Sequence, residues 1–125
     1  MNASDLNETL NGITSGKTLA EIISKEVEIY KLLFQKKGSS ISLYFNEDKV
    51  ITLSSSSIKK LLNETYNGNL SNVHLAYICD CLTLGEKVVY ESEFLENLIF
   101  SLADPEINGG FKKPEEISSL LNKFT

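Results

Sequence analysis

One stretch of the sequence, DPEINGGFKKPE at positions 104–115, spaces oxygen-bearing side chains in a way that could bind a metal ion. Calcium-binding EF-hand loops place their ligands at loop positions 1, 3, 5, 7 and 12, with glycine at position 6. In this stretch the ligand positions hold Asp104, Glu106, Asn108, the carbonyl of Gly110, and Glu115. The spacing therefore makes a calcium-binding module one hypothesis for the function.

Other features of the same stretch argue against a calcium loop. Pro105 is unusual inside such a loop, and Glu106 is longer than the preferred Asp or Asn. Lys112 and Lys113 add two cations, and no second loop of this kind is available to pair with it. The alternative is a connection in which proline and glycine end one helix and begin the next.

The residues most able to do nucleophilic or metal chemistry are few: one histidine, His74, and two cysteines, Cys79 and Cys81. On a helix His74 and Cys81 lie two turns apart, roughly 10 Å, which is too far for a hydrogen-bonded dyad. Cysteines two residues apart on a helix point to different faces, and two thiols are too few for structural zinc. Because familiar enzyme motifs are also missing, we expect reduced thiols, no cofactor and no enzymatic activity.

Acidic side chains are the remaining candidates, and they could act together as a negative surface. Such a surface would attract a basic partner and occupy a site that normally binds phosphates. The alternative is that each acid is simply solvated. The residues assigned to partner binding form two patches: Glu47 and Asp48 in one, and Asp80, Glu91, Glu93, Glu96, Asp104 and Glu106 in the other.

The overall charge favours a protein partner over nucleic acid. The chain has 17 acidic and 12 basic residues, and every basic residue is a lysine. Base readout and planar phosphate recognition depend on arginine, and excess acid repels a polyanion, so we expect no direct contact with nucleic acid. The N-terminus lacks a secretory signal, and no run approaches the ~18 apolar residues that span a bilayer. We therefore expect a cytoplasmic protein with no membrane contact.

The elements that must position these residues are mainly helical. Apolar spacing and capping residues predict helices over 18–36, from the serine run 54–57 to Asn67, from Ser71 or Asn72 to Leu82, from Ser92 to Leu102, and from Pro114 to Phe124. Residues 27–34 also alternate well enough to form a strand. Alternation over 41–45 and 50–53, about a turn at 46–48, predicts an antiparallel β-hairpin, and 87–92 reads as an extended piece.

A chain of 125 residues fits one domain. Residues 1–17, rich in Asn, Thr, Ser and Gly, are expected to form a flexible arm or a short helix, and residues 18–125 a single globular domain. The predicted fold class is α+β, a helix-dominated single domain with a small antiparallel β-hairpin.

The stretch from about 71 to 124, above all LAYICDCLTLGEKVVYESEFLENLIFSLADPEINGGF, resembles the C-terminal half of small bacterial immunity proteins. These proteins are encoded beside contact-dependent growth inhibition (CDI) toxins. The resemblance covers under half of the chain. It implies a protein without catalysis that binds one cognate toxin domain, often a nuclease, and blocks its active site or substrate entry. Contacting positions differ from pair to pair in such families, so the acidic candidates above come from charge alone.

Overall fold

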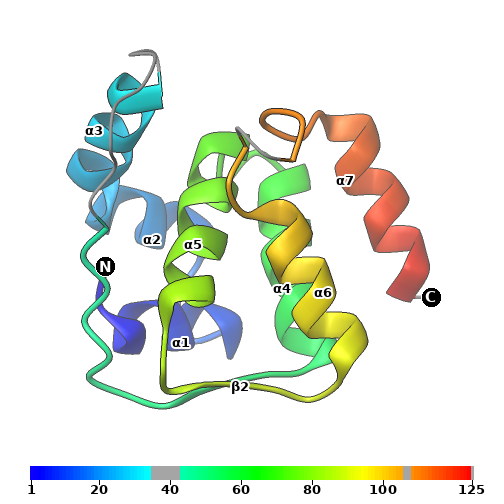
Figure 1. Cartoon of the computed structure of the whole chain (residues 1–125), viewed down its shortest axis with the longest axis horizontal. Coiled ribbons are helices and arrows are strands. Elements are labelled where there is room, and N and C mark those ends of the chain that lie inside the picture. Colours follow the sequence, from blue (N-terminus) through cyan, green and yellow to red (C-terminus); the bar gives the residue numbers. More distant parts are fainter. Residues whose placement is uncertain (35–42, 106–107, 125) are drawn as a thin grey trace.

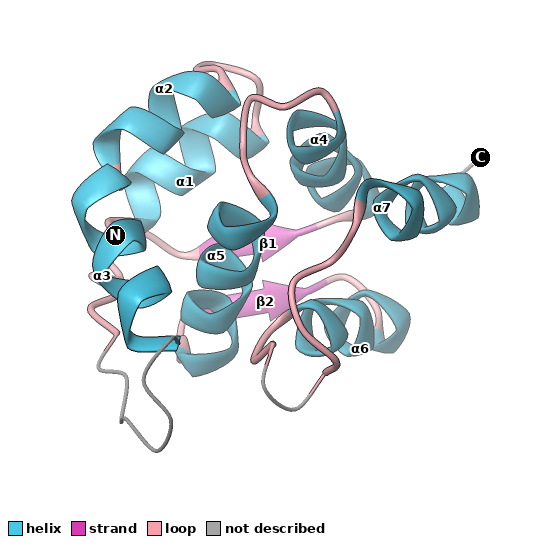
Figure 2. Cartoon of the chain, turned by 90° about the horizontal axis from the view of Figure 1, so that it is seen from above, coloured by secondary structure: helices cyan, strands magenta, loops and turns pink. Residues whose placement is uncertain are grey.

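The computed structural model of the protein describes residues 1–34, 43–105 and 108–124, and these residues are mostly helical. Helix α5 lies at the centre, with α1, α2 and α3 on one side and α6 and α7 on the other (Figures 1 and 2). The elements, in chain order, are α1 (Ala3–Leu10), α2 (Gly16–Ile22), α3 (Ser24–Phe34), β1 (Ile51–Leu53), α4 (Ser55–Tyr66), α5 (Asn72–Leu84), β2 (Val88–Tyr90), α6 (Glu93–Leu102), α7 (Pro114–Leu121) and a 3₁₀ turn, η1 (Asn122–Phe124). The helix-dominated part of the predicted fold class is confirmed.

The predicted antiparallel hairpin is wrong. β1 pairs in parallel with β2, and the register sets Ile51 opposite Val88 and Leu53 opposite Tyr90. Parallel strands need a crossover connection, and α4 and α5 supply it between β1 and β2. The turn at 46–48 therefore does not fold the chain back on itself.

The segment before β1 runs beside the N-terminus instead. The Asn46 backbone N–H donates to the Met1 carbonyl at 2.9 Å, and the Ala3 N–H donates to the Asn46 carbonyl at 2.8 Å. Leu43 and Phe45 alternate with polar residues because each packs one side against the core. Their pattern thus reflects half-burial, not pairing with residues 50–53; residues 41–42 lie outside the described residues.

The predicted helix over 18–36 is two helices in its described part, residues 18–34, and residues 35–36 lie outside the described residues. The chain leaves helical geometry at Ile23, which has φ −98° and ψ 9° and is fully buried between α2 and α3. The break turns Leu19 of α2 and both Val27 and Tyr30 of α3 toward one core. No proline or glycine marks it, so apolar spacing alone predicts one continuous helix. Residues 27–34, which also had a strand-like pattern, are helical.

The predicted starts of α4, α5 and α6 are confirmed by their caps. Ser54, Ser71 and Ser92 each accept a hydrogen bond from the backbone N–H three residues further on, at 3.1–3.3 Å. Helix α4 ends at Tyr66 with Asn67 as its C-cap residue, followed by Gly68 with φ +84°, a conformation that glycine adopts without strain. These ends are fixed by residues next to them in sequence, which makes them readable from sequence.

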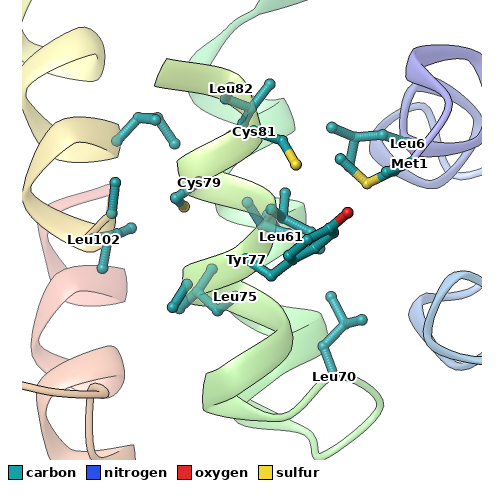
Figure 3. Packing of buried hydrophobic residues seen from close by; sticks show 14 of the residues in the cluster. Met1, Leu6, Leu61, Leu70, Leu75, Tyr77, Cys79, Cys81, Leu82 and Leu102 are labelled. Atoms are coloured by element: carbon teal, nitrogen blue, oxygen red, sulfur yellow. The ribbon is translucent and has the colours of Figure 1, made fainter. Parts of the chain in front are cut away.

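The core surrounds α5, which is buried along most of its length. Figure 3 shows the two cysteines on different sides of this helix, with Cys79 facing α6 and Leu102, and Cys81 facing Met1 and Leu6. Both thiols are free and buried. Among the described residues, no helix is long and apolar enough to cross a bilayer.

Candidate partner-binding face

The carboxylates of the first predicted acidic patch, Glu47 and Asp48, accept hydrogen bonds from other parts of the same chain. The Glu47 carboxylate accepts hydrogen bonds from the backbone N–H groups of Glu86 and Lys87, at 3.1 and 2.8 Å, just before β2. The Asp48 carboxylate accepts from the backbone N–H and the hydroxyl of Ser4, at 2.8 and 2.6 Å. The N-cap residue Asn2 makes no side-chain cap, so Asp48 satisfies the first turn of α1 in its place. Both acids tie together segments that are distant in sequence.

Asp80 and Asp104 also take part in internal contacts. The half-buried Asp80 carboxylate accepts from the Tyr30 hydroxyl and from the Asp104 backbone N–H, the latter at 2.6 Å. Burial raises the pKa of Asp80, and these two hydrogen bonds oppose that shift. Asp104 itself has φ +46°, a left-handed conformation that asparagine and aspartate tolerate better than most residues. Glu106 lies outside the described residues.

The other three acids, Glu91, Glu93 and Glu96, are exposed. None of their carboxylates forms a hydrogen bond or ion pair with the described part of the chain. Glu91 follows β2, while Glu93 and Glu96 occupy the first turn of α6. The positive end of the helix dipole favours negative charge at these positions, which accounts for part of the placement of these glutamates. Their carboxylates are nevertheless open to an external cation.

Exposed phenylalanines lie on the same helix. Phe94 is 51% exposed and Phe100 is 49% exposed, although residues of this type are usually buried. At 100° per residue, Glu93, Glu96, Asn97 and Phe100 share one arc of α6, opposite the buried Leu95, Leu98, Ile99 and Leu102. We call this exposed arc the α6 face.

The phenylalanines of α6 were not among the residues assigned to partner binding. A helical wheel places both Phe94 and Phe100 outside the arc of the four buried residues, so the signal was present in the spacing. What the spacing could not show is that both rings stay about half exposed in the fold.

The structure uses the side chain of one proposed calcium ligand, Asn108, in another way. The Asn108 amide donates to the carbonyls of Phe100 and Ala103 at the end of α6, at 3.1 and 2.5 Å. The Lys112 ammonium lies 3.1 Å from the Asn108 carbonyl oxygen. Glu115 is exposed at the start of α7, and no group of three His, Cys, Asp or Glu side chains in the described residues could hold a metal. Calcium binding stays a prediction, which a calorimetric titration with calcium would test.

His74 takes part in a helix cap. Its Nδ1 accepts a hydrogen bond from the Ser71 backbone N–H at 3.2 Å and lies 2.6 Å from the Ser71 hydroxyl. Burial lowers the pKa of His74, with partial compensation from the backbone of Ala20. The imidazole therefore favours its neutral form, which is the form that can accept at Nδ1.

A small tyrosine-lined pocket between α3, α5 and residues 43–44 was not predicted. It has a volume of about 140 Å³ and is lined by Glu26, Ile29, Tyr30, Leu33, Leu43, Tyr44 and Tyr77. The Glu26 carboxylate accepts from the Tyr77 hydroxyl and forms an ion pair with the Met1 amino group at 2.6 Å. Because the Met1 amino group already compensates the charge of Glu26, this pocket attracts an external cation much less than the glutamates of α6 do.

Comparison with known proteins adds no relative. No protein-family model matches the sequence, and neither a curated protein nor a solved structure is significantly similar to the chain.

Proposed function

We propose that the protein is an immunity protein that binds a cognate toxin domain and neutralises it by masking its active site or substrate-binding surface. The observation that carries the proposal is the α6 face. It combines carboxylates that have no partner within the described residues with a half-exposed phenylalanine, Phe100. Protein interfaces typically join such aromatic anchors to a charged rim.

The charge of the α6 face suits a nuclease domain in particular. A nuclease needs a basic surface to hold phosphates, and carboxylates can occupy the same positions. Opposite charges on the two proteins would also speed their association and discourage binding to acidic surfaces. The net charge of −5 acts in the same direction over a longer range. In this role the protein needs no catalytic group of its own.

Co-expression with the product of the adjacent reading frame tests the proposal. We expect that product to be toxic alone, to be harmless with this protein, and to co-elute with it on gel filtration. If the neighbour is not toxic, or if the two proteins elute separately, the proposal fails.

Charge reversal then tests the face. Replacing Glu93→Lys together with Glu96→Lys should weaken the complex roughly tenfold or more, because each change places like charges at the contact. The matched control is Glu8→Lys with Glu21→Lys, which makes the same change in net charge on α1 and α2. Both control residues are exposed, and their helices lie across the molecule from α6 (Figure 2). Equal affinity for the two double variants would show that α6 is only solvated surface.

A further inference from the structure

Helices α6 and α7 run antiparallel to each other (Figure 1). At one end, residues 103–113 connect the two helices. At the other end, the Phe94 ring lies against the Phe124 ring, with centroids 6.2 Å apart. Between these ends is a groove of about 410 Å³ lined by Ser101, Lys112, Glu115, Glu116, Ser119 and Leu120.

The groove exists because α7 packs mainly against α4. The only fully buried residue of α7 is Ile117, while Leu120 is half-buried and contributes its side chain to the groove. The opposite wall comes from Ser101 of α6, which lies one helical turn after Asn97 of the α6 face, on the same side of the helix. The groove is therefore continuous with the surface that we propose for partner binding.

The hydrogen-bond acceptors on the walls of the groove differ in whether they already have a partner within the protein. Lys112 lies 3.8 Å from the Glu116 carboxylate, which also accepts from the Lys113 backbone N–H. The Glu115 carboxylate makes no hydrogen bond or ion pair with the residues that the structure describes. The Ser119 hydroxyl likewise has no such partner. An unpaired carboxylate, serine hydroxyls and an apolar floor at Leu120 thus face one space.

We propose that this groove receives an arginine side chain of the toxin domain, an inference that rests on the proposed function. An arginine has an apolar stem that can lie along Leu120 and a planar head with five N–H donors. That head can donate to the Glu115 carboxylate and to serine hydroxyls at the same time, whereas the single ammonium of a lysine is less suited to acceptors in several directions. The negative wall favours a cation over a neutral side chain.

The experiment measures affinity between the full chain and the toxin domain for two groove variants. Glu115→Gln removes the charge and keeps the shape, and Ser119→Tyr fills the groove from an exposed position. We expect each variant to bind roughly tenfold more weakly, a change equivalent to the loss of one ion pair or side-chain anchor. Glu21→Gln on α2 is the matched control for the charge change and should bind like the unmodified protein.

The partner residue is found by pairing Glu115→Gln with replacement of each surface arginine of the toxin domain by glutamine. One arginine should show no further loss when Glu115 is already changed. If both groove variants bind normally while Glu93→Lys with Glu96→Lys weakens the complex, the groove assignment is overturned and the proposed function stands. If no arginine is coupled to Glu115, the assignment is likewise overturned. If the neighbouring protein is not toxic, the proposed function fails first and the groove assignment falls with it.

Discussion

The Tyr30 hydroxyl donates a hydrogen bond to the Asp80 carboxylate and so joins α3 to α5. The same carboxylate holds the Asp104 backbone N–H at the start of the loop that follows α6. One acidic side chain therefore connects three segments that lie far apart in the sequence.

Removing the Asp80 side chain should cost much more stability than neutralising it. Asp80→Ala leaves the Tyr30 hydroxyl and the Asp104 N–H without a partner, so we expect a loss of about 1–3 kcal/mol in the free energy of unfolding. Asp80→Asn keeps a polar group in place and removes a charge that burial disfavours, so it should be near the wild-type value at pH 7. Urea unfolding of both variants tests this, and equal losses would contradict the burial argument.

The pH dependence of the same pair has a definite sign. Because the pKa of Asp80 is raised above its ordinary value of 3.8, the folded state favours the protonated carboxyl. Its contribution to stability is complete below pH 3.8 and is lost as the pH rises through the raised pKa. The difference in stability between the wild type and Asp80→Asn should therefore change over that interval and level off above it.

His74 should make the protein less stable in mild acid. Because its pKa in the folded protein lies below the ordinary value of 6.5, the unfolded chain binds the proton more tightly. The contribution of His74 is complete above pH 6.5 and is lost as the pH falls toward the lowered pKa. His74→Gln can accept from the Ser71 N–H without titrating, and it should lack this part of the pH dependence. The test is to measure the urea midpoints of the wild type and of His74→Gln at pH 7, 6 and 5. A decline of equal size in both proteins would contradict the prediction.

Asp48 should protect the first turn of α1 from solvent exchange. Asp48→Ala removes the acceptor of the Ser4 backbone N–H, so that amide should exchange faster, whereas Asp48→Asn should protect it in part. Hydrogen bonds from Ser4 lower the pKa of Asp48, so its contribution is present above the ordinary value of 3.8 and is lost as the pH falls through the lowered pKa. Unchanged exchange at Ser4 in Asp48→Ala would show that the contact is not needed.

Neither cysteine should react in the folded protein. Burial raises the pKa of the Cys81 thiol to about 11 and that of Cys79 further still, so almost no thiolate forms at neutral pH. We expect both thiols to react with Ellman's reagent at the rate of protein opening, and both to react at once in urea. Rapid labelling of one thiol without denaturant would contradict the buried positions in Figure 3.

The parts of the fold that were readable from sequence are those fixed by near neighbours. Ser54, Ser71 and Ser92 cap helices through bonds to residues three positions away, and each stands just before an apolar helical pattern. The predicted strand pairing was wrong because the partner of β1 is β2, which lies beyond two helices in the sequence. Alternation reports that a segment has one buried side, but it does not report what covers that side.

The acidic candidates also fall into two groups, those that accept hydrogen bonds from distant parts of the chain and those that stay open to solvent. Glu47, Asp48 and Asp80 read as surface charge because carboxylates are usually exposed, yet each accepts hydrogen bonds from groups 24–50 residues away. Glu93 and Glu96 remain as open charges on α6. Sequence could locate the charges but not the backbone N–H groups that some of them satisfy, since those groups come together only in the fold.

The parallel pairing of β1 with β2 also bears on how quickly the native state forms and how long it lasts. Since α4 and α5 lie between the strands, the strands pair only after a long loop has closed, whereas each helix and its cap can form from local contacts. We expect changes in β1, such as Thr52→Gly, to speed unfolding much more than they slow folding. This three-residue strand would then govern the lifetime of the folded molecule, while the helices govern the rate at which it appears.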